Sequence, residues 1–540
     1  MERRQCVIFF LFSVTFFVFC ELGACSTTED DLTSCLTTAG VHNFTTIDDP
    51  TYGSLVSLSI KNLRFTTPPS VITQEPFVVI LPEDTPQLAS SIRCARAASY
   101  TIVLRSGGHS YEGFSSVSET SPFVVLDLMN LDRVAVDLET ETAWVQGGAT
   151  LGELYHAIGS SSKRYAFPAG MCPTVGVGGH FSGGGYGTLA RKFGLSADNI
   201  VDAELVDGEG RVLDRNTMGE DVFWAIRGGG GGNWAAVADW KIKLLEIPET
   251  VTAFQVARTG SPAEMAKLWH KWQLFAAEVE DESFLMIQIA SKNETHGPGV
   301  IVLNFVGVFL GPRESAFSSM ASAFPELNVG SDDLKEMTWL ESVTFTSVSD
   351  RVLQVSDLKN RFLYEKAFSK IKSDFVREPM TEDGIRGALE IIAEQPKAVL
   401  ALNPYGGAMR RIVSDAIAFP HRAGNLYSID YIVQWQEEGD TESDLCVRWL
   451  RRIYEYMTPY VSNEPRASYV NDVDLDLGTI DWNKLQGTSG VEATEIARAW
   501  AEKYFLGNYD RLVRAKTVID PRNVFRHPQS IPPISILDAA

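Results

Sequence analysis

The sequence is poor in histidine, cysteine and basic residues, and it has no long apolar segment beyond its first residues. Its 540 residues include 8 His, 7 Cys and 47 Lys and Arg against 69 Asp and Glu, for a formal net charge of −22. Nucleic acid and anionic membrane surfaces repel so acidic a chain, so we expect neither as a partner. No cysteine and histidine spacing matches a zinc site, and we expect no bound metal. The expected partner is a small molecule or an oligosaccharide.

The first 25 residues have the pattern of a secretory signal peptide. Arg3 and Arg4 precede the apolar run Val7–Phe19, which is too short to span a bilayer. Small residues then precede a cleavage site near Cys25. The same string is also typical of a lipoprotein signal, which stays as an alternative. We expect a secreted, extracellular monomer, with a vacuolar address as the other possibility.

Few cysteines remain after removal of the signal: Cys35, Cys94, Cys172 and Cys446. They allow about three pairings, and in an oxidising compartment Cys35 and Cys94 are the natural disulfide candidates. Two glycosylation sequons begin at Asn43 and Asn293, and both suit the surface of an exported protein.

Strand and helix patterns divide the chain into an α+β region and a second region that begins near residue 249. Residues 72–247 alternate short strands with helices, as in the strand Thr101–Leu104 and the helix Thr85–Ala98. Residues 249–478 begin with a capping box at Ser261 and continue with apolar strands. We expect a second α+β domain there, built on an antiparallel sheet covered by helices.

Glycine is concentrated in three places: Gly107-Gly108, the stretch Gly170–Gly187 and the run Gly228–Gly232. Glycine lets the backbone approach a ligand closely and adopt positive φ. The G-x-G-x-x-G fingerprint is absent, so a Rossmann fold is not indicated. We interpret the clusters as the cradle of a large phosphate-bearing ligand, although tight turns are the simpler explanation of each cluster alone.

Several side chains in or near these clusters can be interpreted either as structural residues or as reactive groups of a site. Cys172 alone is more often buried or disulfide-bonded than reactive. In a strand over 426–435, Asp430 and Ser428 share one face, and an edge strand would leave Asp430 in water. The segment Tyr469–Asp476 holds three alternate carboxylates, among them Asp472, and is interpreted as an acidic loop or as part of a site.

The motifs together resemble the berberine bridge enzyme-like family of plant flavoproteins. The resemblance rests on the segments 105–113, 168–187, 223–232, 420–431 and 504–533. It implies a two-part FAD-binding domain of the PCMH type, formed by residues 26–248 and completed by the C-terminal segment 479–540, with the substrate-binding domain over 249–478. It also implies a Cys35–Cys94 disulfide and a cell-wall location.

The resemblance further implies FAD attached at two points, with His109 bonded to the 8α-methyl group and Cys172 to C6. Val175 falls at the position of the family's oxygen gate, where a small residue is typical of oxidases. Asn233 belongs to an Asn-Trp-Ala segment that replaces the more usual Ser-Phe-Gly. The remaining residues expected to bind the cofactor are Arg105, Ser106, Gly107, Gly108, Ser110, Gly176, Gly178, Gly179, His180, Gly183, Tyr186 and Asn523.

On the substrate side the resemblance implies that Asp430 is the catalytic base and that Tyr111 and Tyr186 line the pocket. Asp472 stands where the family commonly has a tyrosine. An aspartate base resembles the flavin-dependent oligosaccharide oxidases, so we expect oxidation of an anomeric hydroxyl, as in a cello-oligosaccharide, to a lactone, with molecular oxygen reduced to hydrogen peroxide. The alternatives are oxidation of monolignol-type allylic alcohols or alkaloids, a non-redox cyclisation, and a flavin-binding protein with weak or no redox activity.

Overall fold

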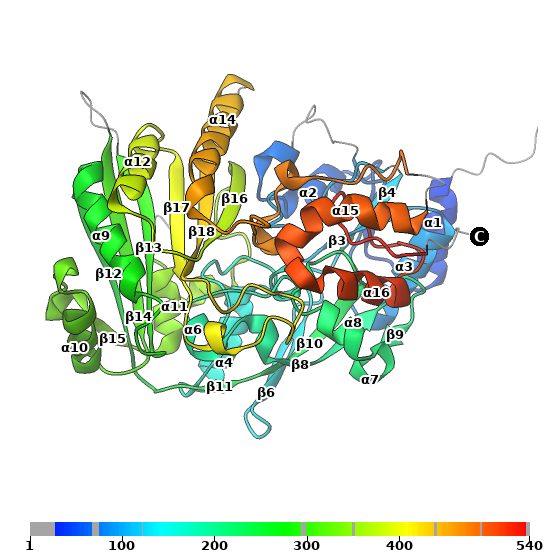
Figure 1. Cartoon of the computed structure of the whole chain (residues 1–540). Helices are drawn as coiled ribbons and strands as arrows, with labels where there is room; N and C mark the ends of the chain where they lie inside the picture. Colours follow the sequence, from blue (N-terminus) through cyan, green and yellow to red (C-terminus); the bar gives the residue numbers. More distant parts are fainter. Residues whose placement is uncertain are drawn as a thin grey trace, which may run out of the picture.

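The computed structural model describes residues 28–66, 75–120, 122–292, 299–347, 352–436, 440–485 and 489–535. The expected signal peptide and the sequon at Asn293 lie outside these ranges. Within them, no helix is both long enough and apolar enough to cross a membrane. Helices and sheets are mixed throughout, and two sheet systems lie side by side, with the seven-stranded one at the left of Figure 1.

The first region contains a four-stranded sheet in the order β1-β2-β4-β3, in which β2 and β3 run parallel to β4. Its strands are β1 (Phe44–Thr46), β2 (Val78–Ile80), β3 (Thr101–Arg105) and β4 (Phe123–Asp127). The helix expected after the first apolar strand is α3 (Thr85–Ala97), with Asp84 as its side-chain cap and a proline in its first turn. The predicted strand–helix alternation is therefore confirmed here.

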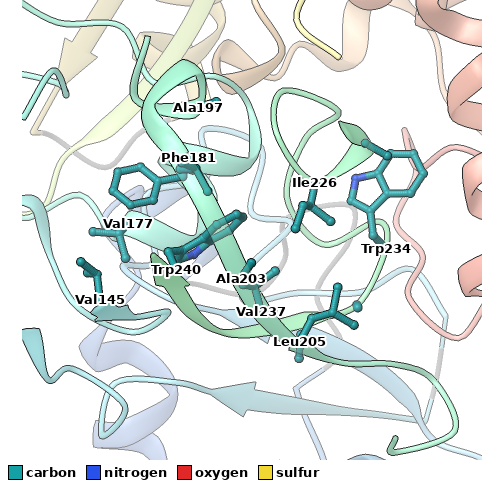
Figure 2. Packing of buried hydrophobic residues seen from close by; sticks show 14 of the residues in the cluster. Val145, Val177, Phe181, Ala197, Ala203, Leu205, Ile226, Trp234, Val237 and Trp240 are labelled. Carbon is teal, nitrogen blue, oxygen red and sulfur yellow. The ribbon is translucent and has the colours of Figure 1, made fainter. Parts of the chain in front are cut away.

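This region also contains a five-stranded antiparallel sheet in the order β5-β6-β10-β8-β9 and a two-stranded one formed by β7 (Tyr165–Ala166) and β11 (Leu245–Glu246). The strands of the five-stranded sheet are β5 (Val134–Asp137), β6 (Thr142–Gln146), β8 (Ile200–Val206), β9 (Val212–Leu213) and β10 (Ala236–Lys243). Figure 2 shows the core on one face of this sheet, where Trp240 of β10 packs edge-on against Phe181 at 5.9 Å between ring centroids. Phe181 belongs to α5 (Val177–Ser182), so this packing fixes the glycine-rich segment on the sheet.

The first helix, α1 (Thr28–Thr38), is joined to α3 by the Cys35–Cys94 disulfide. The predicted pairing is therefore confirmed. Cys172 and Cys446 are free thiols. The other helices of the first region are α2 (Tyr52–Leu58), α4 (Leu151–Ser161), α6 (Ala190–Phe193), α7 (Arg215–Met218) and α8 (Glu220–Ala225).

The second region is built on a seven-stranded sheet in the order β15-β12-β14-β13-β17-β18-β16. Its strands are β12 (Val251–Gly260), β13 (Ser283–Lys292), β14 (Val300–Phe309), β15 (Lys335–Met337), β16 (Phe368–Val376), β17 (Ala398–Pro404) and β18 (Tyr427–Trp435). All its pairings are antiparallel. One face is covered by α9 (Pro262–Phe275), α12 (Glu382–Ala393) and α14 (Asp440–Tyr456) (Figure 1). The capping box expected at Ser261 begins α9.

The strand β18 lies between β17 and β16, so the edge-strand interpretation of Asp430 is wrong. Its odd-numbered residues, such as Ile429 and Tyr431, are buried in the helix-covered core. Asp430 therefore points to the opposite face, where Ser373 of β16 is its partner in register. Smaller helices α10 (Arg313–Ala323), α11 (Trp339–Thr346) and α13 (Ala408–Arg411) lie at the margins of this region.

The C-terminal helices α15 (Gly490–Phe505) and α16 (Tyr509–Ile519) return to the first region and pack beside α8 (Figure 1). Lys516 is fully buried there, where its ammonium group is paired with Asp520 at 2.7 Å and donates to the carbonyl groups of Asn233 and Phe525. The last described segment therefore completes the core that the first half of the chain begins.

Candidate active site

Two glycine-rich loops touch at Gly107 and Gly176. A Cβ atom added at Gly107 would lie 2.2 Å from the Gly176 nitrogen, and one added at Gly176 would lie 2.3 Å from the Gly107 nitrogen. Both positions therefore require glycine. The contact brings His109 Nε2 to 2.9 Å from the Thr174 hydroxyl oxygen, and Cys172 Sγ lies 3.5 Å from that same oxygen. The two expected attachment residues thus face one space.

That space is a cavity of about 370 Å³ lined by the first region and by the segments 469–473 and 504–529. Its walls include the loops that contain His109 and Cys172, the glycine run 230–232 and the C-terminal segment. Phe114 stacks on His527 with 4.5 Å between ring centroids, so the first and last parts of the chain close one side together. Of the residues expected to bind the cofactor, the lining includes Ser106, Gly107, Gly108, His109, Ser110, Cys172, Val175, Gly176, Gly178, Gly179 and His180.

The cavity has unsatisfied polar groups that fit a large ligand. The backbone N–H groups of residues 107–111 donate to no acceptor among the described residues. Arg526 lines the cavity, and its buried Nε has no partner in the described part of the chain. A cation and free N–H groups suit a phosphate-bearing ligand, and glycine walls suit a planar ring. The residues present therefore fit FAD.

The histidines of the cavity are held neutral by burial. Burial lowers the pKa of His109 to about 3, with a further contribution from the charge of Lys61. Burial likewise lowers the pKa of His180 to about 4, and His180 Nε2 accepts a hydrogen bond from the Gly170 N–H at 3.0 Å. A neutral imidazole keeps a lone pair available, which a nucleophile or hydrogen-bond acceptor needs.

Arg105 is not among the residues that line the cavity, in contrast to our expectation. Its side chain is 1% exposed, with Nε 2.7 Å from Asp127 Oδ2. Its other nitrogens donate to the carbonyl groups of Leu55 and Val56 at 3.0 and 3.1 Å. Each of the three nitrogens of the guanidinium thus donates inside the protein, and Arg105 fixes α2 against β3 and β4.

Gly183, Asn523 and Tyr186 also lie outside the lining of this cavity. A Cβ at Gly183 would be 2.0 Å from the side-chain oxygen of Asn471, so the glycine makes room for that residue. Asn523 is 2% exposed with a positive φ of 53°, and it forms part of the turn before Arg526. Tyr186 lies toward the second sheet, where its hydroxyl donates to the carbonyl group of Pro404.

The structure brings Asp430 and Asp472 together across the site. Asp430 accepts a hydrogen bond from Asn403 Nδ2 at 2.9 Å, and the two carboxyl groups also hydrogen-bond to each other. Burial raises the pKa of Asp430 to about 6. Burial and the charge of Asp430 raise the pKa of Asp472 further, well above its usual range. At neutral pH the pair therefore holds one proton, on Asp472, which donates it to ionised Asp430.

Aromatic rings surround the carboxyl pair. Tyr186 stacks on Tyr405 with 5.6 Å between centroids and 10° between planes. Burial, then the charge of Asp472, raises the pKa of Tyr111, which lines the cavity and stays protonated. Met171 and Tyr186 pack on an apolar patch of the second sheet that includes Phe284. The substrate side is thus aromatic, with two acidic groups at its centre.

Sequence reasoning missed part of the cavity wall. Tyr469 is a wall residue whose phenolic oxygen accepts hydrogen bonds from the Gly185 N–H at 3.0 Å and from Asn471 Nδ2 at 2.8 Å. Its only sequence signal is its place in the acidic segment 469–476. The other missed wall residues include Phe114, Met171, Asn471, Arg526, His527 and Gln529.

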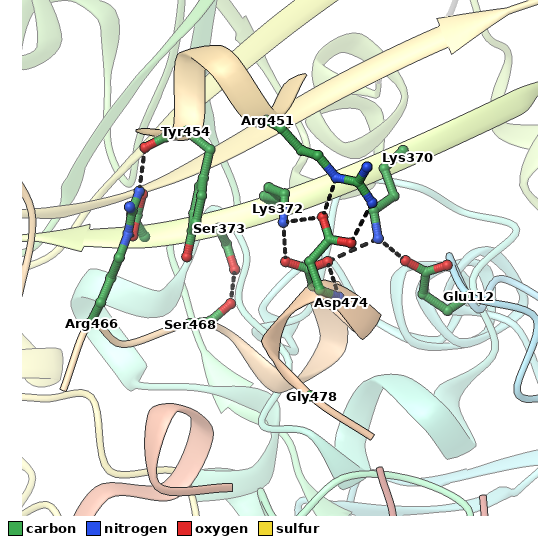
Figure 3. A network of polar contacts seen from close by, with 12 residues as sticks. Glu112, Lys370, Lys372, Ser373, Arg451, Tyr454, Arg466, Ser468, Asp474 and Gly478 are labelled. Atoms are coloured by element: carbon green, nitrogen blue, oxygen red, sulfur yellow. Dashed lines mark hydrogen bonds and ion pairs between the residues drawn. The ribbon is translucent and has the colours of Figure 1, made fainter. Parts of the chain in front are cut away.

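The acidic segment is not a solvated loop, because its carboxylates are built into the interior. Asp474 is 1% exposed and pairs with Lys370 at 2.8 Å and with Lys372 at 2.6 Å. Lys370 also pairs with Glu112, the neighbour of Tyr111, and Asp476 pairs with Lys372 and Arg451. Figure 3 shows this chain of ion pairs along β16. It joins the loop of Tyr111, the second sheet and the loop of Asp472.

Family models match both ends of the chain. The model described as "FAD binding domain" matches residues 76–216. The model described as "Berberine and berberine like" matches residues 468–532. The first covers the loops of His109 and Cys172, and the second covers Tyr469, Asp472 and the C-terminal wall of the cavity.

Similar proteins cover nearly the whole chain. Berberine bridge enzyme-like D-1 from Nicotiana tabacum is 51% identical over 94% of this chain and 92% of its own length. Reticuline oxidase from Eschscholzia californica is 47% identical over 100% and 97%. The structure of berberine bridge enzyme from that plant, also 47% identical, has a TM-score of 0.89 and covers 94% of this chain and 100% of its own. The structure of Phl p 4, described as a grass pollen allergen with glucose dehydrogenase activity, is 36% identical, with a TM-score of 0.86 over 94% and 100%. The chain belongs to the berberine bridge enzyme-like family of FAD-linked oxidoreductases.

Proposed function

We propose that the protein is an FAD-dependent oxidase that uses Asp430 as its base on an alcohol substrate. The observation that carries this proposal is the buried Asp430–Asp472 pair, of which Asp472 lines the cavity that fits FAD. Alcohol oxidation requires removal of an O–H proton while a hydride leaves the same carbon. FAD held by the loops of His109 and Cys172 would supply the acceptor for the hydride, with molecular oxygen as the final acceptor and hydrogen peroxide as its product.

The side chains of the site divide the work of binding and proton transfer. Asp430 accepts the hydroxyl proton, and its raised pKa makes it a stronger base than an exposed aspartate. Asp472 donates a hydrogen bond that holds Asp430 ionised and fixed in direction. Tyr111 and Tyr186 offer aromatic faces to the substrate, and Asn403 positions the base from β17.

We propose that the flavin is attached through both His109 and Cys172, which face one space beside the same hydroxyl group. The denatured wild-type chain is expected to be heavier by one FAD, and the Cys172→Ala chain is expected to retain it through His109. The double variant His109→Ala, Cys172→Ala is expected to lose all covalent flavin while binding FAD non-covalently. Intact mass spectrometry after denaturation measures each state, and a wild-type chain without added mass would contradict the proposal.

The substrate we propose first is an oligosaccharide oxidised at its anomeric hydroxyl to a lactone. Carboxylate acceptors beside aromatic faces are suited to sugar hydroxyl groups and to the apolar faces of sugar rings. Phl p 4, with glucose dehydrogenase activity, has the same fold. Peroxide release on a panel of cello-oligosaccharides, other sugars, cinnamyl alcohols and alkaloids tests this choice, and release confined to a non-sugar class would contradict it.

A second candidate is a basic alkaloid, because two carboxyl groups in an aromatic pocket also suit a protonated amine. Reticuline oxidase is among the similar proteins. The two candidates separate by charge. An amine substrate would bind more weakly in Asp430→Asn, because this variant removes the negative charge of the pair, whereas a neutral sugar would keep both hydrogen-bonding partners.

We also propose that the protein is exported. The Cys35–Cys94 disulfide is typical of an oxidising compartment, and the sequon residue Asn43 is exposed. Treatment of the secreted protein with peptide-N-glycosidase is expected to lower its mass by that of an N-linked glycan. A reduced, unglycosylated protein retained in cells would contradict this assignment.

The reaction is expected to slow as pH falls through about 6, because protonation of Asp430 removes the base. Asp472 donates a hydrogen bond to Asp430, and that bond lowers the pKa of Asp430. Asp472→Ala removes the donor and is therefore expected to shift the acidic limb to higher pH. Stopped-flow measurement of flavin reduction against pH checks both statements, and an acidic limb unmoved in Asp472→Ala would contradict the hydrogen bond between the two carboxyl groups.

A further inference from the structure

We propose that the hydroxyl group of Thr174 transfers the proton of the Cys172 thiol to His109 Nε2 while the bond between Cys172 and the flavin forms. This inference rests on the two-point attachment proposed above and adds a residue that controls it. Thr174 would act on the attachment step and would not be a catalytic residue of substrate oxidation.

The geometry of Thr174 carries the proposal. Its hydroxyl oxygen lies 2.9 Å from His109 Nε2 and 3.5 Å from Cys172 Sγ. Thr174 is 1% exposed, so water does not compete for these contacts. The Gly107–Gly176 contact holds the two loops together and fixes the distances. A hydroxyl group can accept one proton and donate another, so this arrangement links sulfur and nitrogen without a water molecule.

The contact with Thr174 determines which nitrogen of His109 is available to the flavin, and this sets the order in which the two bonds form. Because Nε2 faces Thr174, Nδ1 is the nitrogen of His109 that remains for the bond to the flavin. Once Nδ1 is bonded, Nε2 is the only imidazole nitrogen that can take up a proton. The thiol then donates to Thr174, and Thr174 donates to Nε2, which leaves a thiolate as the nucleophile. The His109 bond is therefore formed first.

Burial keeps the sulfur protonated before attachment, because it raises the pKa of the Cys172 thiol. The Thr174 hydroxyl, the N–H groups of Thr174 and Val175, and the charge of Lys61 act in the opposite direction and offset part of that rise. Lys61 is positioned by a hydrogen bond from its ammonium group to the carbonyl oxygen of Arg361 at 3.1 Å. Because burial also lowers the pKa of His109, both shifts oppose the transfer, and a direct path through Thr174 is expected to matter for the rate.

The attachment of Cys172 balances in atoms and electrons when molecular oxygen is the oxidant. A new carbon–sulfur bond replaces the S–H bond of Cys172 and one C–H bond of the ring. The two electrons and the two protons released pass to oxygen, which leaves as hydrogen peroxide. The proton on His109 Nε2 is one of those two.

The test follows Cys172 in the full-length chain, produced at low oxygen and then exposed to air. Iodoacetamide added after denaturation marks Cys172 that is still free, and peptide mass spectrometry gives its fraction over time. In Thr174→Val the loss of free Cys172 is expected to be about 100-fold slower than in wild type. Attachment through His109 is expected to persist. Thr174→Ser keeps the hydroxyl and is expected to proceed close to the wild-type rate.

The control is Thr188→Val, which replaces another threonine near the glycine-rich stretch that does not line the cavity. A wild-type rate in Thr174→Val would overturn the proposal. Equal slowing in Thr174→Val and Thr174→Ser would also overturn it, because a variant that keeps the hydroxyl would then be as slow as one that lacks it. Wild-type protein with no flavin on His109 would instead overturn the two-point attachment itself, so the two failures are distinguishable.

Discussion

Asp430→Asn is expected to slow flavin reduction by substrate by about 10²–10⁴-fold, the usual contribution of a positioned general base. The amide has the same shape and still accepts a hydrogen bond from Asn403, but it cannot take up the hydroxyl proton. The proposed attachment of the flavin should be unaffected, because His109 and Cys172 lie in the other region of the chain. Stopped-flow absorbance under anaerobic conditions, with saturating substrate, measures the reduction step directly.

A matched control is Gln434→Ala, which changes an exposed residue four positions further along the same face of β18. Its reduction rate is expected to remain near that of wild type. Unchanged reduction kinetics in Asp430→Asn would remove Asp430 from the mechanism. Equal slowing in Gln434→Ala would show that the strand, and not the base, is responsible.

Asp474→Ala is expected to lower the free energy of unfolding by about 3–5 kcal/mol, because it removes the carboxylate that the two buried lysines share. Asp474 accepts from both Lys370 and Lys372, which are each 3% exposed in their side chains. Glu112 and Asp476 can compensate for only part of the loss. The urea midpoint, followed by tryptophan fluorescence on the holoenzyme, gives the change.

Asp383→Ala is the comparison variant, since Asp383 forms an ion pair with Arg386 on the surface and its side chain is 85% exposed. Such a pair contributes about 0–1 kcal/mol. If both variants unfold at the same urea concentration, the buried network does not stabilise the protein.

Local patterns in the sequence were sufficient to predict the elements that hold the cofactor loops. The β-branched run before Gly107 predicts the strand that leads into the loop of His109. The alternation of apolar and polar residues around Asp430 predicts which residues share its face. Both follow from chemistry between near neighbours in the chain. The fold class and the two anchor residues became a single hypothesis only through the family resemblance.

These local patterns do not predict which residues far apart in the chain come into contact. Nothing near Asp472 indicates that it meets Asp430, because the contact depends on β18 being an interior strand of the second sheet. Asp474 looks like part of a solvated loop until Lys370 and Lys372 are placed beside it on β16. Arg105 is the opposite case. Its position beside the glycines predicts a contact with the ligand, but in the structure it forms an internal ion pair with Asp127.

The return of the C-terminal segment to the first region determines when the protein becomes functional during biosynthesis. His527 and Gln529 belong to the cavity wall, and Lys516 ties α16 to Asn233. A ribosome-bound chain that lacks these residues has an open cavity and an incomplete core, however well its earlier strands have formed. Cofactor loading must therefore follow release of the whole chain, and premature termination even a few codons before Ile531 removes a wall of the site along with the tail.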